Sequence, residues 1–503
     1  QTLSSGEYYL DGDVTISQTI TVSGTVTLDL NGHVLQYKND STKGSVIKVE
    51  SGGQLTIQDS CKDDTTAVHK FDTTNDLWVL DENGSETVTG GVITGGTGYP
   101  FTLTSSTVVY YGGGVYIASG GQLTMTGGNI ICCSAEFGGG VCIYPRQGAE
   151  ASQFSMSGGS IAGCVASNSG GGVRASGTFK MSGNAVIRSC TAESATQYVC
   201  GGGVYVNVSS SFEMSDTAII EGCQAISTSS NSSNGGGVYV SSSSFVMSNE
   251  AKIEGCQAIS NSSKSSKGGG VHLSNATTFT LSGSAVIQNC TATNSANSGE
   301  AYGGGVSAAC VKEITLADSA RIVGCAAANG SGLYITGSQV PGYGILYANS
   351  GSVDGDVVLG DTEDGPCTIT GSGGTVFNGK VTVTPGSTIE SGTFNGEVIN
   401  NGTIKGGTFT GTVINSESGT IAEGVSITAL KFVVTFDNEG TRTTAIIDNG
   451  DKLNEPTVQT KEGYRFGGWY APAMWVKGKI YYCAQPVGQV AASTATPPDA
   501  TKL

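Results

Sequence analysis

The stretch Gly201-Gly-Gly-Val-Tyr-Val206 decides how this chain folds, because the sequence repeats it. The same unit, glycines followed by alternating residues, begins at Gly112, Gly138, Gly170, Gly235, Gly268 and Gly303. Successive units lie 26 to 35 residues apart, and a period in this range is typical of repeat architectures. Each unit is therefore expected to bury its apolar face against its neighbours rather than alone.

Three short apolar segments fill each repeat. In the unit that begins at Gly201 they are Val204–Val206, Phe212–Met214 and Ile220–Cys223. The first two alternate apolar and polar residues, which is typical of a strand with one buried face, and no helical period appears. Such short strands can pair with their copies in the next unit but not with one another. The sequence therefore predicts an all-β, right-handed parallel β-helix, its hand following from the usual crossover between parallel strands.

Glycine triplets are expected at the corners of this solenoid. They allow positive φ and a close approach of one coil to the next, where a Cβ atom would clash. The alternative, a phosphate-binding loop, would need a following helix and a Gly-Lys-Ser sequence, and the repeats contain neither. The serine-rich stretches Ser227–Asn234 and Ser260–Lys267, which precede two of the triplets, are expected to be mobile loops.

The third segment of each repeat ends in a cysteine. If the chain bends after the isoleucine, the cysteines point inward and stack at about 4.8 Å per coil. We expect reduced thiols, because a disulfide needs Cβ atoms about 3.8 Å apart. Bridges between neighbours are the alternative, and a line of equivalent sulfurs does not make a tetrahedral metal site. The seven are Cys133, Cys164, Cys190, Cys223, Cys256, Cys290 and Cys325.

Composition limits the partners of this chain. It has 503 residues, 78 of them glycine, and a formal net charge of −17. This charge argues against nucleic acid and anionic membrane surfaces as partners. The sequence contains neither a transmembrane stretch nor a signal peptide, so no membrane insertion is expected. Because Gln1 is no initiator methionine, we expect a processed piece of a longer protein.

Changes in the pattern predict how the chain is divided. Residues 1–430 are expected to form the β-helix. Within it, 61–89 interrupt the pattern with charged residues and are expected to form an insertion loop. From 351–430 the triplets stop and the period shortens, which predicts tighter terminal coils. A second module is predicted at 431–490, and the tail 491–503, with two prolines and no core residues, is expected to be disordered.

Two stretches resemble known bacterial proteins. Leu28-Asp-Leu-Asn-Gly-His33 resembles a strand near the start of bacterial extracellular β-helices with an adhesin-like, pectin-lyase-like fold. Val434-Thr-Phe-Asp437 and Lys461-Glu-Gly-Tyr-Arg-Phe-Gly-Gly-Trp-Tyr470 are similar to the Listeria–Bacteroides repeat, a small β-grasp-like module of bacterial surface proteins. This resemblance implies secretion and display on the bacterial cell surface, and it names no ligand.

Two pairs of carboxylates are candidate catalytic groups. Asp354 and Asp356, if they lie on a strand, share a face about 6.6 Å apart, near the separation in inverting glycosidases. A structural calcium site and a solvated acidic turn are the alternatives for this pair. Glu221 and Glu254 occupy equal places in adjacent coils, at a spacing like that of a retaining pair, or are two surface carboxylates. No other cofactor or metal is expected, and the Gly-His-Gly of polygalacturonase-like hydrolases is absent.

One outward residue per coil lies between the inward residues of the first strand. Stacking places these residues in a row about 29 Å long. Tyrosine offers a flat apolar face with a hydroxyl, so the row predicts a strip that binds a glycan or a protein segment. Cross-strand stacking that only stabilises the sheet is the alternative. The row consists of Tyr116, Cys142, Arg174, Tyr205, Tyr239, His272 and Ser307.

These observations favour a secreted, adhesin-like protein of the bacterial surface over an enzyme. Its partner would be a host glycan or glycoprotein, bound chiefly by Tyr116, Arg174, Tyr205, Tyr239 and His272. The first alternative is a glycan-active β-helix enzyme, either a hydrolase or a lyase, which would need acids that converge in a groove. The second is a structural stalk that binds nothing.

Overall fold

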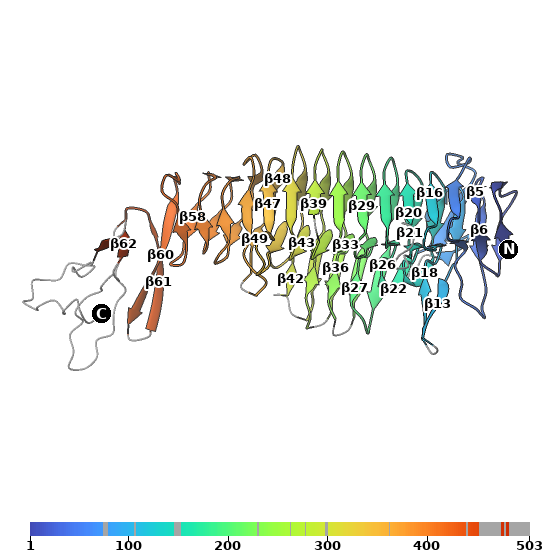
Figure 1. Ribbon diagram of the computed structural model, residues 1–503, viewed down its shortest axis with the longest axis horizontal. Coiled ribbons are helices and arrows are strands. Elements are labelled where there is room, and N and C mark those ends of the chain that lie inside the picture. The colour runs from blue at the N-terminus through green and yellow to red at the C-terminus, as the bar shows by residue number, and fades with distance from the viewer. Residues whose placement is uncertain are drawn as a thin grey trace, which may run out of the picture.

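The computed structural model is a long solenoid of stacked strands, with no helix in the part of the chain that it describes (Figure 1). Three sheets of 17, 15 and 14 strands run along it, and nearly all of their strands pair in parallel. The predicted all-β parallel β-helix is thereby confirmed. The described residues are 1–73, 79–104, 107–144, 152–228, 231–261, 263–276, 278–296, 300–361, 363–438, 441–451, 474–476 and 479–481.

Each coil of the regular body contributes one strand to each of the three sheets. In one coil these strands are β28 (Val204–Val206) in sheet 1, β29 (Ser211–Met214) in sheet 2 and β30 (Ile219–Glu221) in sheet 3. Each strand pairs with its copy in the next coil, so that Phe212 lies beside Phe245. Like residues therefore stand above like residues along the solenoid, as the repeat predicts.

The core consists of these rows of identical side chains. The rings of sheet 2 stack nearly parallel, with neighbouring centroids 4.8–5.2 Å apart. They are fully or almost fully buried, and burying a phenylalanine stabilises the fold by about 1.5–3 kcal/mol. The stack consists of Phe154, Phe179, Phe212, Phe245 and Phe279.

The cysteines that end the third segments are buried free thiols. Cys223 is representative: its Sγ lies 3.4 Å from the carbonyl oxygen of Glu221 and 3.9 Å from that of Ile187 in the preceding coil. A thiol is a weak donor and a small apolar group, so it fills this corner without leaving a strong polar group unpaired.

The glycine triplets occupy the corners where successive coils approach most closely. Gly235 has φ +65°, in the left-handed region that favours glycine. A Cβ atom on Gly236 would lie 2.3 Å from the carbonyl carbon and oxygen of Gln257, near the end of the same repeat. One on Gly237 would lie 2.7 Å from the oxygen of Gly270. Backbone stands where a side chain would go, so the triplet is required by packing as well as by φ.

The serine-rich stretches are not simple loops, and the expectation of mobility is wrong for the paired residues at their ends. They build a fourth, side sheet from outgoing strands such as β31 (Gln224–Ser227) and β36 (Gln257–Ser260) and returning strands such as β32 (Ser233–Asn234) and β37 (Ser266–Lys267). Figure 1 shows this sheet along one side of the solenoid, around β27, β36 and β42.

Small residues hold the side sheet together. Ala225 and Ala258 are buried inside it. The hydroxyl of Ser227 donates to the carbonyl of Asn231 at 2.7 Å, and the hydroxyls of Ser233 and Ser266 lie 3.1 Å apart. These buried hydroxyls find partners inside the sheet, as buried polar groups must. Alternating alanine and serine therefore form a narrow second core.

The insertion within 61–89 is a small antiparallel sheet rather than a loop. It contains β9 (Val68–Asp72), β10 (Val79–Leu80) and β11 (Glu86–Thr89). Its Phe71 and Val88 pack onto apolar residues of sheet 3 that point out of the solenoid, such as Val34, Val92 and Ile131. These outward residues would otherwise be exposed to water, so the insertion covers them.

The shorter coils near the C-terminus continue the same three sheets. The last solenoid strand of sheet 1 is β58 (Val413–Asn415), which pairs in parallel with the start of β60 (Leu430–Asn438). The rest of β60 pairs in antiparallel fashion with β61 (Thr441–Asp448). The predicted module therefore begins as an extension of sheet 1, while the motif at 461–470 and the tail at 491–503 lie outside the described residues.

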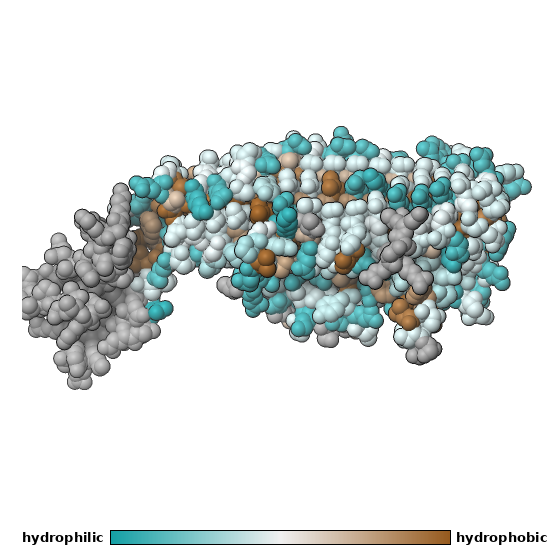
Figure 2. All heavy atoms as spheres, in the orientation of Figure 1, coloured by the Kyte–Doolittle hydropathy of each residue, from teal (hydrophilic) through white to brown (hydrophobic). Residues whose placement is uncertain are grey.

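The surface of the solenoid is mostly polar. Figure 2 shows one face that is largely pale and teal, with hydrophobic residues in small separate spots. In the described part of the chain, no helix has both the length and the apolar character that crossing a membrane requires.

We expect Gly236→Ala to destabilise the protein strongly, by at least about 3 kcal/mol, because its new methyl group meets the main chain of Gln257. Gly255→Asn is the matched control. Gly255, unlike Gly236, has positive φ, but no atom lies within 4 Å of a Cβ placed there, and Asn289 at the matching place adopts φ +54°. Its expected cost is below about 1 kcal/mol, since asparagine tolerates this region. Denaturant unfolding measures both, and equal stabilities would contradict the packing argument.

Candidate binding site

The row predicted from the sequence exists on the outer face of sheet 1. Adjacent strands pair so that each member lies beside the next one, for example Arg174 beside Tyr205 and Tyr205 beside Tyr239. The full register runs through Tyr116, Cys142, Arg174, Tyr205, Tyr239, His272 and Ser307. Arg174, Tyr205 and Tyr239 are half-buried, whereas the other four members are buried.

Tyr116 is not on an exposed strip, which corrects the sequence expectation. Only 4% of its surface is accessible, because the hairpin of β13 (Tyr99–Thr104) and β14 (Thr107–Tyr111) covers it. The ring of Tyr99 stacks on it with centroids 4.9 Å apart and an interplanar angle of 9°. Burial raises the pKa of Tyr116, whose hydroxyl stays protonated. Its role is to anchor the hairpin on the solenoid.

His272 is also buried, at 4% exposure, so it is no exposed contact residue. Its ring packs beside Tyr239 with centroids 5.4 Å apart, and its Nδ1 has no hydrogen-bond partner among the described residues. Burial lowers the pKa of His272 to about 3, and the positive charge of Lys267 acts in the same direction. The imidazole is therefore neutral at physiological pH.

Arg174 lies between aromatic rings. Its guanidinium carbon is 4.7 Å from the ring centroid of Phe137, 5.6 Å from that of Tyr205 and 5.7 Å from that of Tyr111. Cation–π contacts of this kind are worth about 0.5–2 kcal/mol each. Burial raises the pKa of neighbouring Cys142 to about 11, although the Arg174 charge opposes this rise. The thiol is therefore neutral and does not neutralise the arginine.

Arg174 and Tyr205 line a hollow of about 450 Å³ between sheet 1 and the side sheet. A volume of this size is within the usual range of small-ligand sites, about 300–1,000 Å³. Polar side chains from the side sheet complete its wall, and the exposed ring of Tyr198 stands at its rim. The lining residues that matter below are Phe137, Asn168, Arg174, Gln197, Tyr198 and Tyr205.

A change in the length of one segment, from one coil to the next, accompanies this hollow. Between the buried cysteine and the next glycine triplet, one coil has only the five residues Val165–Ser169, and the following coil has the ten residues Thr191–Cys200. The side sheet widens at this step, which leaves space beside Arg174. Sequence reasoning missed Phe137, Asn168 and Gln197, but the longer segment between the cysteine and the next glycine triplet was a signal that could have located them.

The two middle tyrosines form a stacked pair. The rings of Tyr205 and Tyr239 have centroids 5.2 Å apart and an interplanar angle of 4°. The hydroxyl of Tyr205 donates to Oδ1 of Asn207 at 3.3 Å, and burial raises the pKa of Tyr205. The pair thus offers an apolar surface that continues from the hollow along the row.

The candidate glutamates lie on another face. Glu221 and Glu254 are register neighbours on β30 and β35 (Lys252–Glu254) of sheet 3. The carboxylate of Glu254 lies 3.8 Å from Nζ of Lys252, and both side chains are more than a third exposed. The two glutamates stand on the outer face of sheet 3 and do not line the hollow beside Arg174.

The candidate aspartates do not share a strand, so the expected spacing along one strand face is wrong. β48 (Ser352–Val353) ends before Asp354, and β49 (Val357–Leu359) begins after Asp356. Both aspartates are engaged at this corner: Oδ2 of Asp354 lies 3.5 Å from Arg321, and Oδ1 of Asp356 accepts a hydrogen bond from the amide of Lys380 at 2.9 Å. No grouping of three or more His, Cys, Asp or Glu suited to a metal ion occurs among the described residues.

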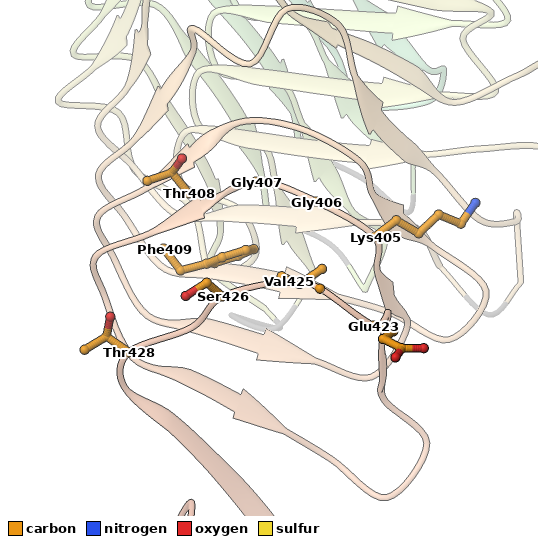
Figure 3. A pocket seen from close by; sticks show the side chains of 10 residues that line it. Lys405, Gly406, Gly407, Thr408, Phe409, Glu423, Val425, Ser426 and Thr428 are labelled. Carbon is orange, nitrogen blue, oxygen red and sulfur yellow. The ribbon is translucent and has the colours of Figure 1, made fainter. Parts of the chain in front are cut away.

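A second hollow, of about 600 Å³, lies at the C-terminal end of the solenoid (Figure 3). Its floor is the ring of Phe409, the last in a stack with Phe394, and the side chain of Val425 lies near it. Lys405 points away from the centre and pairs with Glu390 at 3.3 Å. Phe409 is part of the core that ends here, but the lining is largely polar, and the charged groups of Lys405 and Glu423 do not converge in it.

Part of the C-terminal region matches a known family. The family model of the Listeria–Bacteroides repeat domain matches residues 432–481. The match begins inside β60 and confirms the resemblance noted at Val434–Asp437 and Lys461–Tyr470. No solved structure matches the chain. A bacterial repeat of this kind joined to a parallel β-helix fits a surface protein.

We expect His272 to make the stability depend on pH. Above pH 6.5 the histidine is neutral in both the folded and the unfolded chain. Between about 6.5 and about 3 the unfolded chain binds a proton that the folded chain does not, so stability falls as the pH falls. The slope from this one group is at most about 1.4 kcal/mol per pH unit.

His272→Gln should remove that contribution. Denaturant unfolding at a series of pH values measures the difference between the variant and the original chain, in which all other titrations cancel. Ser307→Ala, at the next place in the row, keeps the histidine and should keep the slope. Parallel stability curves for His272→Gln and the original chain would show that burial does not hold the imidazole neutral.

Proposed function

We propose that this chain is part of a secreted, adhesin-like bacterial surface protein whose β-helix binds a host glycan or glycoprotein. The contact surface is the hollow beside Arg174 together with the ring pair that extends from it. The Listeria–Bacteroides match and the parallel β-helix support the surface location. The hollow is the single observation that supports binding.

The chemistry of the hollow suits a sugar. Sugar rings have apolar faces that pack on aromatic rings, and Tyr205 with Tyr239 provides a flat stacked surface. Sugar hydroxyls need donors and acceptors, and the amides of Asn168 and Gln197 line the same space. A few polar groups that converge in an otherwise aromatic hollow are typical of ligand sites.

The buried members of the row are not assigned to ligand contact in this proposal. Tyr116 holds the neighbouring hairpin and His272 packs below the surface, so neither touches the ligand. Contact is assigned to Arg174, Tyr205 and Tyr239, which are half-buried. This leaves a shorter contact surface than the 29 Å row predicted from the sequence.

A glycan array tests this proposal, with the double variant Tyr205→Ala/Tyr239→Ala beside the original chain. We expect the original chain to bind a subset of glycans and the variant to bind at least about 30-fold more weakly, because central aromatic contacts cost about 2 kcal/mol or more when truncated. Circular dichroism confirms that the variant folds.

Tyr9→Ala is the matched control, because Tyr9 is 69% exposed and lies on β2 (Gly6–Tyr9) in sheet 2, away from the hollow. It should bind like the original chain. Binding that survives in the double variant would contradict this surface, and an array with no binding would favour a structural stalk. Product analysis of any bound glycan distinguishes an enzyme, which would release fragments.

A further inference from the structure

Arg174 is a cation with no carboxylate partner among the described residues. Two other basic residues on the sheets have carboxylate partners: Nζ of Lys180 lies 2.9 Å from Glu213, and Nη1 of Arg188 lies 2.9 Å from Glu86. For Arg174, no carboxylate forms an ion pair within the described part of the chain; it interacts with the neutral thiol of Cys142, and its Nε is buried without an acceptor. An unsatisfied donor of a charged group is costly to bury, so such a site calls for an acceptor.

The register explains why the two strands paired with β23 (Val173–Ala175) provide no carboxylate. In its row Arg174 stands between Cys142 and Tyr205, and neither offers a carboxylate. Aromatic rings occupy its surroundings instead, at 4.7 Å for Phe137 and 5.6 Å for Tyr205. Cation–π contacts satisfy the faces of a guanidinium and not its in-plane N–H groups; because Nε is buried, a ligand would meet the terminal Nη groups.

The in-plane edge of a guanidinium is matched best by a carboxylate. Two parallel N–H groups meet its two oxygens, and such charge-assisted pairs are about twice as strong as neutral hydrogen bonds. The residue lines the 450 Å³ hollow, so a ligand group that enters this space reaches it. The net charge of −17 disfavours the non-specific gathering of anions, so an anion needs a specific cation here.

The walls of the hollow place further polar groups around that position. The amide nitrogen of Asn168 donates to the side-chain oxygen of Gln197. This bond orients both amides and leaves the oxygen of Asn168 and the nitrogen of Gln197 for a ligand. Tyr205 forms the aromatic side of the same space. The guanidinium of Arg174, the two side-chain amides and this ring therefore face one hollow.

We infer that the ligand is an acidic sugar, a sialic or uronic acid, whose carboxylate binds the guanidinium of Arg174. The sugar ring lies against Tyr205 and its hydroxyls meet Asn168 and Gln197. This inference rests on the proposed glycan binding and adds the charge that selects among glycans. Sialic and uronic acids present the same carboxylate, and the two arms of the test distinguish them.

The test uses matched ligands with and without the charge. One arm compares sialyllactose with lactose, and the other compares tetragalacturonate with its methyl ester, which keeps the size and removes the charge. Isothermal titration calorimetry measures the affinities of the original chain and of Arg174→Gln and Arg174→Lys. We expect the acidic member of at least one pair to bind about 10- to 100-fold more tightly than its neutral counterpart.

The variants locate the effect. Arg174→Gln should lose that preference, and Arg174→Lys should recover only part of it, because an ammonium group keeps the charge but not the paired N–H groups. Lys180→Gln changes the net charge by the same amount on the exposed face of sheet 2 and should leave the affinities unchanged. Thermal unfolding of each variant confirms that the coils remain folded.

The failures of the two proposals are distinguishable. If neutral and acidic glycans bind equally well and Tyr205→Ala/Tyr239→Ala abolishes binding, glycan recognition stands and the role of Arg174 is overturned. A preference for acid that persists in Arg174→Gln also overturns it. If no glycan of either kind binds the original chain, the proposed function and this inference fail together.

Discussion

The structure depends on the close contact of one coil's main chain with the next at the glycine corners. The amide of Gly203 donates to the carbonyl of Gly237 at 3.0 Å, and a Cβ on Gly202 would lie 2.4 Å from the oxygen of Gly236. Side chains cannot enter this contact, so the coils meet in only one register. A slip by one residue would exchange the inner and outer faces of every strand. The phenylalanine stack and the neighbourhood of Arg174 and Tyr205 both follow from that register.

Much of this could be predicted because the repeat itself states the register. The triplets align Val204–Val206 with its copies, so the place of Tyr205 beside Tyr239 followed from counting. What could not be predicted was which members of the row are covered. Tyr116 is covered by the hairpin at 99–111, which belongs to no repeat. The side sheet beside His272 is built from alanine and serine, whose composition gives no strong periodic signal.

The failures near the aspartates have the same physical origin. After Gly351 no triplet marks the corners, so the sequence did not show where strands end. Asp354 and Asp356 stand on either side of Gly355 at a corner, where partners such as Arg321 and the amide of Lys380 engage them. Strand geometry applied to a corner gave a spacing that does not exist. Sequence periodicity is therefore reliable in this chain only where the corner signal is explicit.

In a regular solenoid each side chain contacts the residue at the same place in the neighbouring coil. Few groups are then left for a partner to bind. Phe212 stacks on Phe245, and Lys180 meets Glu213 across one register step. The exception arises where the segment between the buried cysteine and the glycine triplet lengthens, from Val165–Ser169 in one coil to Thr191–Cys200 in the next. At that step the side sheet widens, a hollow opens, and Arg174 has no acidic neighbour in its row. The irregular step, rather than the repeated surface, is where this solenoid can distinguish one ligand from another.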